Sequence, residues 1–380
     1  MMQKRRKKLR LFILLGLVLL LVLLIITART IHSRSSANNS SKNSLSDGAG
    51  KAAVGTEAEQ AEQEALPPLS NDIVVGLKGS EIQPVLQGEP YIENGVYAID
   101  KEYGAIPENN IEIRGDVDTA VPGDYKIQYI AKGGSGYGAA ERTVRVMTEA
   151  DYGDKAENVP VMMYHWVYSE DDLPDVIDAN WILDTRLEEQ LAWLSENKFY
   201  YPGWKELRAW VDDKISLPSK CAVVSFDDGK EAFLKHGVPL LEKYKVPATS
   251  FMICWEKNKG AEKIREYASP YIDFESHTYA MHQYNEPFVN GHKGIMATMT
   301  KDEIKEDLAK TAELLGSNDA LAYPYGDYTE EMTEAVREQG ILCAFTVEYD
   351  RVRKGMDPLR LPRIRVNGDE SFEAWKSSIY

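Results

Sequence analysis

The chain of 380 residues has few cysteines, and their number argues against a disulfide-rich fold. There are three, Cys221, Cys254 and Cys343, and no two of them are closely spaced. An odd number without short spacing is untypical of a disulfide framework, so we expect three buried free thiols. Positive charge is also scarce. The net charge of −16 argues against nucleic acid and other polyanions as partners.

Most of the chain lacks long apolar runs, and the exception lies near the start. Six basic residues among the first ten precede an apolar run over residues 11–28. Eighteen helical residues span about 27 Å, which is close to the roughly 30 Å of a bilayer core. We therefore predict a cytoplasmic basic tail (1–10) and a transmembrane anchor (11–28), with the C-terminal domains outside the cell membrane. Small residues follow the run, so secretion after signal cleavage is the alternative.

The next two regions differ in composition. Residues 29–70 are poor in apolar side chains and rich in Ser, Asn, Ala, Gly, Glu and Gln, which predicts a disordered linker. Residues 71–148 alternate short β-branched runs with glycine turns, which predicts a small all-β sandwich. The segment Val117–Tyr125 resembles bacterial Ig-like modules. This region lacks an aromatic stripe suited to sugar binding, so we expect it to act as a spacer.

Residues 158–380 alternate strand and helix patterns, which predicts an α/β domain with a parallel barrel or a doubly wound sheet. A capping box at Thr300–Glu303 opens a predicted helix that ends near Gly316. The other predicted helices cover 187–193, 204–211, 237–244 and 329–339, and the predicted strands cover 221–225, 248–253, 321–323 and 342–347.

Histidine is scarce too, with six residues in the chain, and two of them stand close together at His277 and His282. A buried apolar run, Val223–Phe226, ends on Asp227, Asp228 and a glycine. Adjacent carboxylates at a strand end repel one another unless a metal or a proton lies between them. One Asp and two His form a common ligand set for a catalytic divalent metal, and the second Asp is then left as a base. Because the histidines are five residues apart, the backbone must bend between them.

These residues carry a resemblance to a known family. From about Pro160 onward the chain resembles polysaccharide deacetylases of the NodB-homology type, carbohydrate esterase family 4, whose fold is a distorted (β/α) barrel. Residues 225–229 (Ser-Phe-Asp-Asp-Gly) resemble the first family motif, which implies Asp227 as general base and Asp228 as metal ligand. The five-residue histidine spacing is similar to that of the branch that deacetylates poly-β-1,6-N-acetylglucosamine, and it implies His277 and His282 as ligands. The segment 321–326 resembles the third motif, which implies that the Tyr325 N–H binds the oxyanion.

The chain departs from the family pattern in two places. Ala322 stands where an arginine normally orients the base, and Arg363 or Arg365 is a candidate replacement. The late histidine that supplies the general acid is absent, because no histidine follows His292. His165, in a segment similar to one in the poly-N-acetylglucosamine branch, is the candidate acid.

The resemblance implies metal-dependent de-N-acetylation of an N-acetylglucosamine-containing surface polysaccharide, either an exopolysaccharide or peptidoglycan, with release of acetate. Zn²⁺ is the expected ion, and Co²⁺, Ni²⁺ and Fe²⁺ suit the same ligands. Four aromatic residues near the motifs are candidate substrate contacts: Trp166, Tyr279, Tyr323 and Tyr328.

Three other functions remain open from the sequence. The same groups could cleave an acetyl ester, as in an acetylxylan-type O-deacetylase. Two His and one carboxylate also form the triad of non-haem iron oxygenases, although those usually sit in all-β folds. The missing arginine and histidine leave open a catalytically inactive carbohydrate-binding module.

Overall fold

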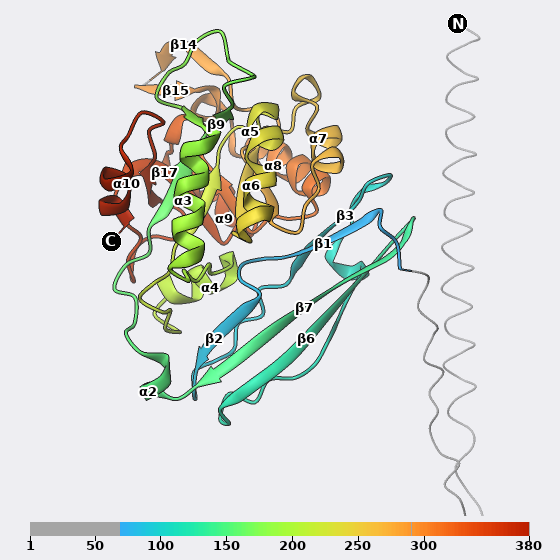
Figure 1. Cartoon of the computed structure of the whole chain (residues 1–380). Coiled ribbons are helices and arrows are strands. Elements are labelled where there is room, and N and C mark those ends of the chain that lie inside the picture. The colour runs from blue at the N-terminus through green and yellow to red at the C-terminus, as the bar shows by residue number, and fades with distance from the viewer. Residues whose placement is uncertain (1–68, 290, 380) are drawn as a thin grey trace, which may run out of the picture. The chain divides into compact units, whose positions relative to one another are not determined.

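Seven parallel strands form a closed barrel in the structure, a computed structural model that describes residues 69–289 and 291–379 (Figure 1). Each strand pairs with the next strand of the barrel in chain order, and the last pairs with the first. The strands are β8 (Val161–Tyr164), β11 (Val223–Phe226), β12 (Ala248–Met252), β13 (Ile272–Ser276), β16 (Ala320–Ala322), β17 (Cys343–Tyr349) and β18 (Leu361–Arg365). Every residue of β8, β11, β12, β13 and β16 is buried, as expected for parallel strands covered on both faces. The predicted (β/α) barrel is confirmed.

Helices follow most of the barrel strands and pack around them. They are α3 (Asp184–Glu196), α4 (Trp204–Val211), α5 (Glu231–His236), α6 (Val238–Tyr244), α7 (Gly260–Glu266), α8 (Lys301–Leu315), α9 (Glu330–Glu338) and α10 (Phe372–Ile379), with the short helices η2 (Glu256–Asn258), η3 (Ile295–Thr298) and η4 (Pro324–Gly326). Two further short helices, η1 (Glu108–Asn110) and α2 (Glu149–Tyr152), precede the barrel. The predicted capping box of α8 is present: the Glu303 carboxylate accepts from the Thr300 N–H at 2.9 Å. The helix ends at Gly316, whose positive φ of 67° suits glycine.

Two small ribbons extend the chain beyond the carboxyl ends of the barrel strands. Strand β9 (Trp166–Tyr168) follows β8 almost directly and pairs in parallel with β10 (Trp181–Leu183). Strand β14 (Tyr284–Val289) comes after β13 and forms an antiparallel pair with β15 (His292–Gly294). Both ribbons therefore belong to the end of the barrel where parallel-barrel active sites lie.

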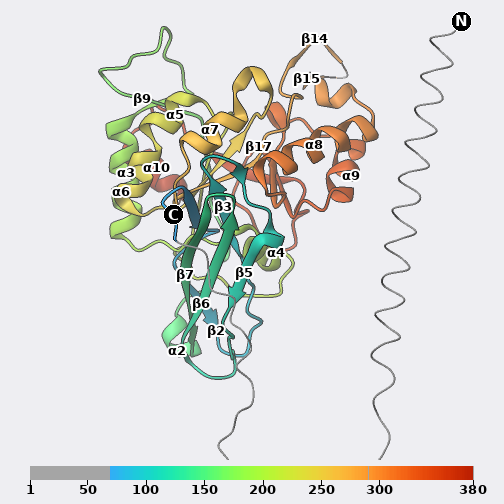
Figure 2. The same cartoon turned by 90° about the vertical axis from the view of Figure 1, so that its right-hand side faces the viewer.

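The N-terminal part of the described chain is the predicted β-sandwich (Figure 2). One sheet has the order β1 (Ile73–Leu77), β3 (Val96–Asp100), β4 (Gly104–Ala105), and the other β2 (Ile82–Leu86), β7 (Gly136–Met147), β6 (Gly123–Gly133), β5 (Ile111–Arg114). The long β6–β7 hairpin turns through the predicted glycine segment 133–136. Val85, Val96, Ile127, Tyr129 and Val144 are among the residues of the core between the sheets.

A lysine between β1 and β2 reaches from the sandwich into the opposite, amino end of the barrel. The Lys78 Nζ donates to Asp319 Oδ2 at 2.6 Å and to Ser317 Oγ at 2.7 Å, and lies 3.5 Å from Glu275 Oε1. Asp273 and Glu275 are buried on β13. Burial raises the pKa of Asp273 to about 6 and that of Glu275 well above its usual value, and the charge of Lys78 opposes both rises.

Further buried contacts join the sandwich to the barrel domain. Asn94 donates from Nδ2 to the Glu206 carboxylate, which also accepts from the Tyr200 hydroxyl at 2.6 Å. The Tyr97 hydroxyl donates to the Ser269 carbonyl at 2.8 Å. These contacts tie the sandwich to the barrel domain, and the expected role of the sandwich as a spacer stays a prediction.

The predicted basic tail, transmembrane anchor and most of the predicted linker lie outside the described residues. Within residues 69–289 and 291–379, no helix is both long and apolar enough to cross a bilayer.

Candidate active site

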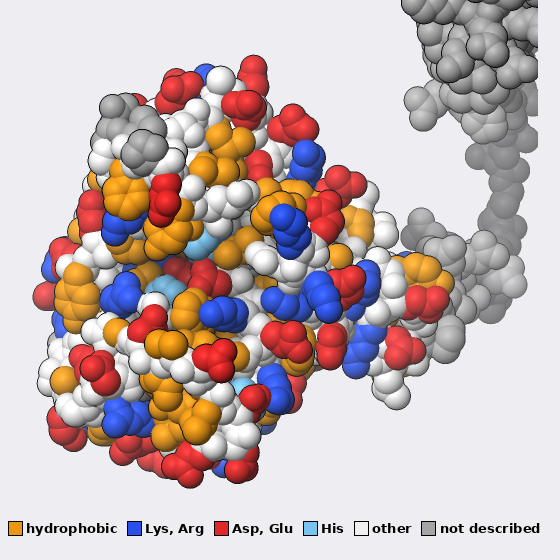
Figure 3. Space-filling view, turned by 90° about the horizontal axis from the view of Figure 1, so that it is seen from above, with side chains coloured by type: hydrophobic (Ala, Val, Ile, Leu, Met, Phe, Trp, Pro, Cys, Tyr) orange, Lys and Arg blue, Asp and Glu red, His pale blue; other side chains and the backbone are white. Residues whose placement is uncertain are grey.

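A cavity of about 410 Å³ opens at the carboxyl ends of the barrel strands. In the space-filling view of this face, histidine and acidic side chains lie in a central hollow with basic and hydrophobic side chains around it (Figure 3). The cavity is lined by His165, Trp166, Asn180, Asp227, Asp228, His277, His282, Tyr284, Lys293, Tyr323, Tyr325, Val347 and Arg365. The two motifs that carry the predicted chemistry therefore meet in one hollow.

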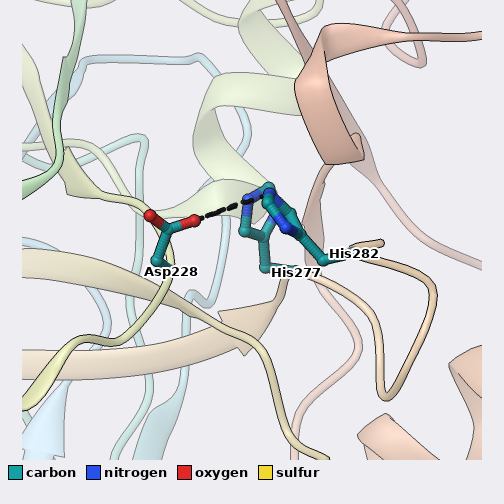
Figure 4. Close-up of side chains that lie close together, drawn as sticks. All are labelled: Asp228, His277 and His282. Carbon is teal, nitrogen blue, oxygen red and sulfur yellow. Dashed lines mark ion pairs between the residues drawn. The ribbon is translucent and has the colours of Figure 1, made fainter. Parts of the chain in front are cut away.

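The three candidate ligands converge although they come from two segments. Asp228 follows β11, and both histidines follow β13 (Figure 4). Asp228 Oδ1 lies 3.5 Å from Nε2 of His277 and 3.5 Å from Nε2 of His282, and the three donor atoms lie within 4.8 Å of one another. The bend expected between the histidines includes Thr278, which has a positive φ of 71°. Asp228 also has a positive φ, 74°, a strained conformation that occurs often at functional sites.

The His277 ring is oriented by the main chain of the next barrel strand. Its Nδ1 lies 2.7 Å from the carbonyl oxygen of Ala322, the last residue of β16. A carbonyl only accepts, so Nδ1 carries a proton, and Nε2 is the ring nitrogen that faces Asp228. Metal-binding histidines commonly donate their other ring N–H to such an acceptor. The donor set and this tautomer fit a divalent metal ion.

The neighbouring Asp227 has a different partner. Its two oxygens accept from Nη1 and Nη2 of Arg363, both at 2.7 Å, and both side chains are buried. Burial alone would raise the pKa of Asp227, but the charge and the two hydrogen bonds of Arg363 hold it below its usual value. Asp227 is therefore ionised at neutral pH. Of the two arginines considered for this role, Arg363 makes the contact, whereas Arg365 donates to Asn180 Oδ1 at 2.6 Å.

His165 and Tyr325 lie in the same cavity. Nδ1 of His165 is buried without a hydrogen-bond partner among the described residues, and burial lowers the pKa of the ring. Its imidazole is therefore neutral at neutral pH. Tyr325 has a positive φ of 61°, and its ring packs between those of His282 and Tyr284, with centroids 4.4 and 4.6 Å away.

The four predicted substrate aromatics are not placed alike. Trp166 and Tyr323 line the cavity, but Tyr323 is fully buried and its hydroxyl donates to the Leu359 carbonyl at 3.1 Å. Tyr328 bonds to Glu348 and is outside the lining. Tyr279 lines a separate pocket with Tyr103 and Lys310. Only Trp166 therefore combines a place in the cavity with partial exposure.

Sequence reasoning missed several residues of the site. Tyr284 and Lys293 come from the β14–β15 hairpin and Asn180 precedes β10, and all three line the cavity. Lys230 places its Nζ 3.1 Å from the centroid of the Trp166 ring. Lys230 could have been suspected because it is two residues from Asp228, whereas the hairpin residues carry no signal in the sequence.

Comparisons with known proteins identify similar sequences. Residues 214–344 match the family model described as polysaccharide deacetylase, and residues 75–146 match the bacterial surface protein Ig-like domain. A poly-β-1,6-N-acetyl-D-glucosamine N-deacetylase of Staphylococcus epidermidis is 28% identical over 55% of this chain and 79% of its own length. A protein of the same name from Staphylococcus aureus is 26% identical over 50% of this chain and 69% of its own length.

Solved structures include similar chains. The structure of IcaB from Ammonifex degensii aligns with 58% of this chain and 95% of its own, with 26% identity and a TM-score of 0.47.

Proposed function

The chain carries a polysaccharide deacetylase domain homologous to the poly-β-1,6-N-acetyl-D-glucosamine N-deacetylases, and we propose that it removes acetyl groups from N-acetylglucosamine units of a surface polysaccharide. One observation carries the proposal. Asp228, His277 and His282 converge in a single cavity, and the ionised carboxylate of Asp227 lies beside them. Such a site suits hydrolysis of an amide at neutral pH.

We propose that Asp228, His277 and His282 hold a divalent metal ion, with Zn²⁺ expected and Co²⁺, Ni²⁺ or Fe²⁺ as alternatives. When bound, such an ion polarises a carbonyl and lowers the pKa of a coordinated water toward roughly 7–9.

The protein residues have distinct proposed tasks. Asp227 takes the proton of the attacking water, and Arg363 keeps this carboxylate ionised and fixed in orientation. The main-chain N–H of Tyr325 supports the oxygen that becomes negative in the transition state. His165 delivers a proton to the departing glucosamine nitrogen. Because its ring starts out neutral, His165 first has to take up a proton, and the proton that Asp227 removes from the attacking water is its source.

We also propose that the protein acts outside the cell membrane, attached by residues 11–28. This proposal rests on the basic and apolar pattern of the first 28 residues alone.

The test is acetate release by the purified protein from β-1,6-linked N-acetylglucosamine oligomers, peptidoglycan and acetylated xylan. We expect release from the glucosamine oligomers, loss of release after chelation, and recovery on adding Zn²⁺. Asp227→Asn is expected to lower turnover by about 10²–10⁴-fold with metal binding retained. Faster release from acetylated xylan would favour an O-deacetylase, and no release from any polymer by metal-loaded protein would favour a binding module.

A further inference from the structure

The two carboxylate oxygens of Asp228 have different surroundings. Oδ1 lies 3.5 Å from Nε2 of each candidate metal-binding histidine. Oδ2 accepts a hydrogen bond from the indole Nε1 of Trp166 at 2.7 Å. The carboxylate is thus held from one side by an indole, and only its other oxygen faces His277 and His282.

We propose that Trp166 is a positioning residue that fixes Asp228 as a one-oxygen metal ligand. This inference rests on the proposed function and adds a role to a residue that sequence reasoning treated as a sugar contact. A free carboxylate can rotate and offer both oxygens, whereas an indole N–H is a donor only and keeps Oδ2 engaged. A hydrogen bond to an ionised acceptor is also about twice as strong as one between neutral groups. One-oxygen binding by Asp228 would leave room at a bound metal ion for water and for the substrate carbonyl.

Two further contacts hold the Trp166 ring in place, one with the Trp181 ring and one with the Lys230 ammonium. Strand β9, which carries Trp166, pairs with β10 so that Trp166 is opposite Trp181, and the two rings meet at 5.0 Å and 65°. The Lys230 Nζ lies 3.1 Å from the Trp166 ring centroid, within the range of a cation–π interaction. A cation over the ring draws electron density from the indole and makes its N–H a better donor.

Asp228 and Lys230 are two residues apart, and both contact the indole ring of Trp166. Asp228 binds the N–H at the ring edge, and Lys230 covers the ring face. Between them, Gly229 has a φ of 58°, and a Cβ there would lie 2.2 Å from Met252 Sδ. Only glycine fits this path without displacing Met252, so glycine permits the turn from which both neighbours reach Trp166.

The experiment measures metal affinity without substrate. Metal-free wild-type and Trp166→Phe proteins are titrated with Zn²⁺ against a chromophoric chelator, and with Co²⁺ by absorption. Phe keeps a ring for Lys230 but has no N–H, so we expect about 10–100-fold weaker Zn²⁺ binding and an altered Co²⁺ spectrum. Lys230→Met is expected to weaken binding by roughly 2–5-fold, the size of a partly exposed cation–π interaction.

Trp181→Phe is the matched control, because it alters the same ring pair without a hydrogen bond to Asp228. We expect its Zn²⁺ affinity to stay within about twofold of wild type, because phenylalanine keeps an aromatic pair with Trp166. Wild-type affinity and spectrum in Trp166→Phe would overturn the proposal, as would an equal loss in Trp181→Phe. If Trp166→Phe fails to fold, the Lys230→Met titration decides, and unchanged affinity there counts against the proposal.

Different results would overturn the positioning role of Trp166 and the proposed deacetylation. Loss of metal affinity in Trp166→Phe together with no acetate release by wild type would support the positioning role and overturn the proposed reaction. Acetate release by both proteins with identical metal affinity would support the proposed reaction and overturn the positioning role. A pure sugar-stacking role predicts a raised KM with unchanged metal affinity, which would also overturn the positioning role.

Discussion

The two ends of the barrel both contain clustered carboxylates, but the partners of these carboxylates differ between the ends. At the amino end, Asp273, Glu275 and Asp319 surround the Lys78 ammonium that the sandwich supplies. At the carboxyl end, Asp227 is matched by Arg363, whereas Asp228 faces two imidazoles across a cavity of about 410 Å³.

The difference shows how a structural charge cluster can be told from a chemical one. Strand β13 contributes to both, with Asp273 and Glu275 within it and His277 just after it. The amino-end charges are covered by protein and neutralised by a side chain, so they serve stability. The carboxyl-end donors converge on a space that protein atoms do not fill, which leaves them free for an ion and a substrate.

Removing the cation of the amino end should have the largest effect. Breaking a buried ion pair by deleting one partner costs about 3–5 kcal/mol, and we expect Lys78→Met to lower the free energy of unfolding by this amount near pH 8. A carboxyl group with a raised folded pKa is protonated below that pKa, so it then needs no counter-charge. Because Lys78 holds the pKa of Asp273 down, at about 6, the variant has a higher pKa at this carboxyl, and the loss should shrink as the pH falls from 8 toward 6.

Chemical denaturation of both proteins at pH 5 and pH 8 measures the loss at each pH. An equal loss at the two pH values would show that Lys78 contributes packing rather than charge.

The corresponding change at the carboxyl end should act on catalysis. Arg363→Lys keeps the charge but loses the two parallel hydrogen bonds to Asp227, and we expect turnover to fall by about 10²-fold through misplacement of the base. With these bonds gone, the pKa of Asp227 rises. The acidic limb of the kcat/KM profile should therefore move to higher pH.

Arg365→Lys is the control, since Arg365 lines the same cavity but binds Asn180. Its pH profile should keep the wild-type acidic limb. A shift of equal size in both variants would mean that general cavity charge, and not the contact with Asp227, sets the profile.

The smallest effect is expected from an exposed ion pair on the sandwich. Lys126 Nζ lies 2.7 Å from Glu141, with both side chains exposed, at 58% and 43%. Such pairs contribute about 0–1 kcal/mol, so Lys126→Met should hardly change the denaturation midpoint at either pH. A loss comparable to that of Lys78→Met would remove the distinction between buried and exposed pairs on which the comparison depends.

The elements that the sequence predicted well carry strong local signals. The predicted helix 204–211 coincides with α4, and α8 has the predicted capping box and C-terminal glycine. Strand ends marked by Asp227 and His277 could be assigned to one end of a barrel because parallel strands end together. All three cysteines are buried and free, as expected.

Other parts of the site depend on contacts between distant segments. Arg363 and Asp227 are 136 positions apart, and the sequence offered Arg365 equally well. Tyr279 is two residues from His277 in the sequence, yet it faces a different pocket after the bend at Thr278, whose φ is positive. The contact of Lys78 with the barrel could not be predicted, because the sequence around Lys78 carries no information about the carboxyl groups that are buried in the barrel.

The contact that orients His277 runs to a main-chain oxygen, that of Ala322. Exchanging the side chain at this position leaves the acceptor in place, provided that β16 keeps its path. Alanine scanning therefore cannot detect the hydrogen bond from His277 to this main-chain oxygen. Residue 322 can likewise vary without disturbing the tautomer of the imidazole. The missing family arginine at that position concerns the base instead, and Arg363 binds both oxygens of Asp227 in its place.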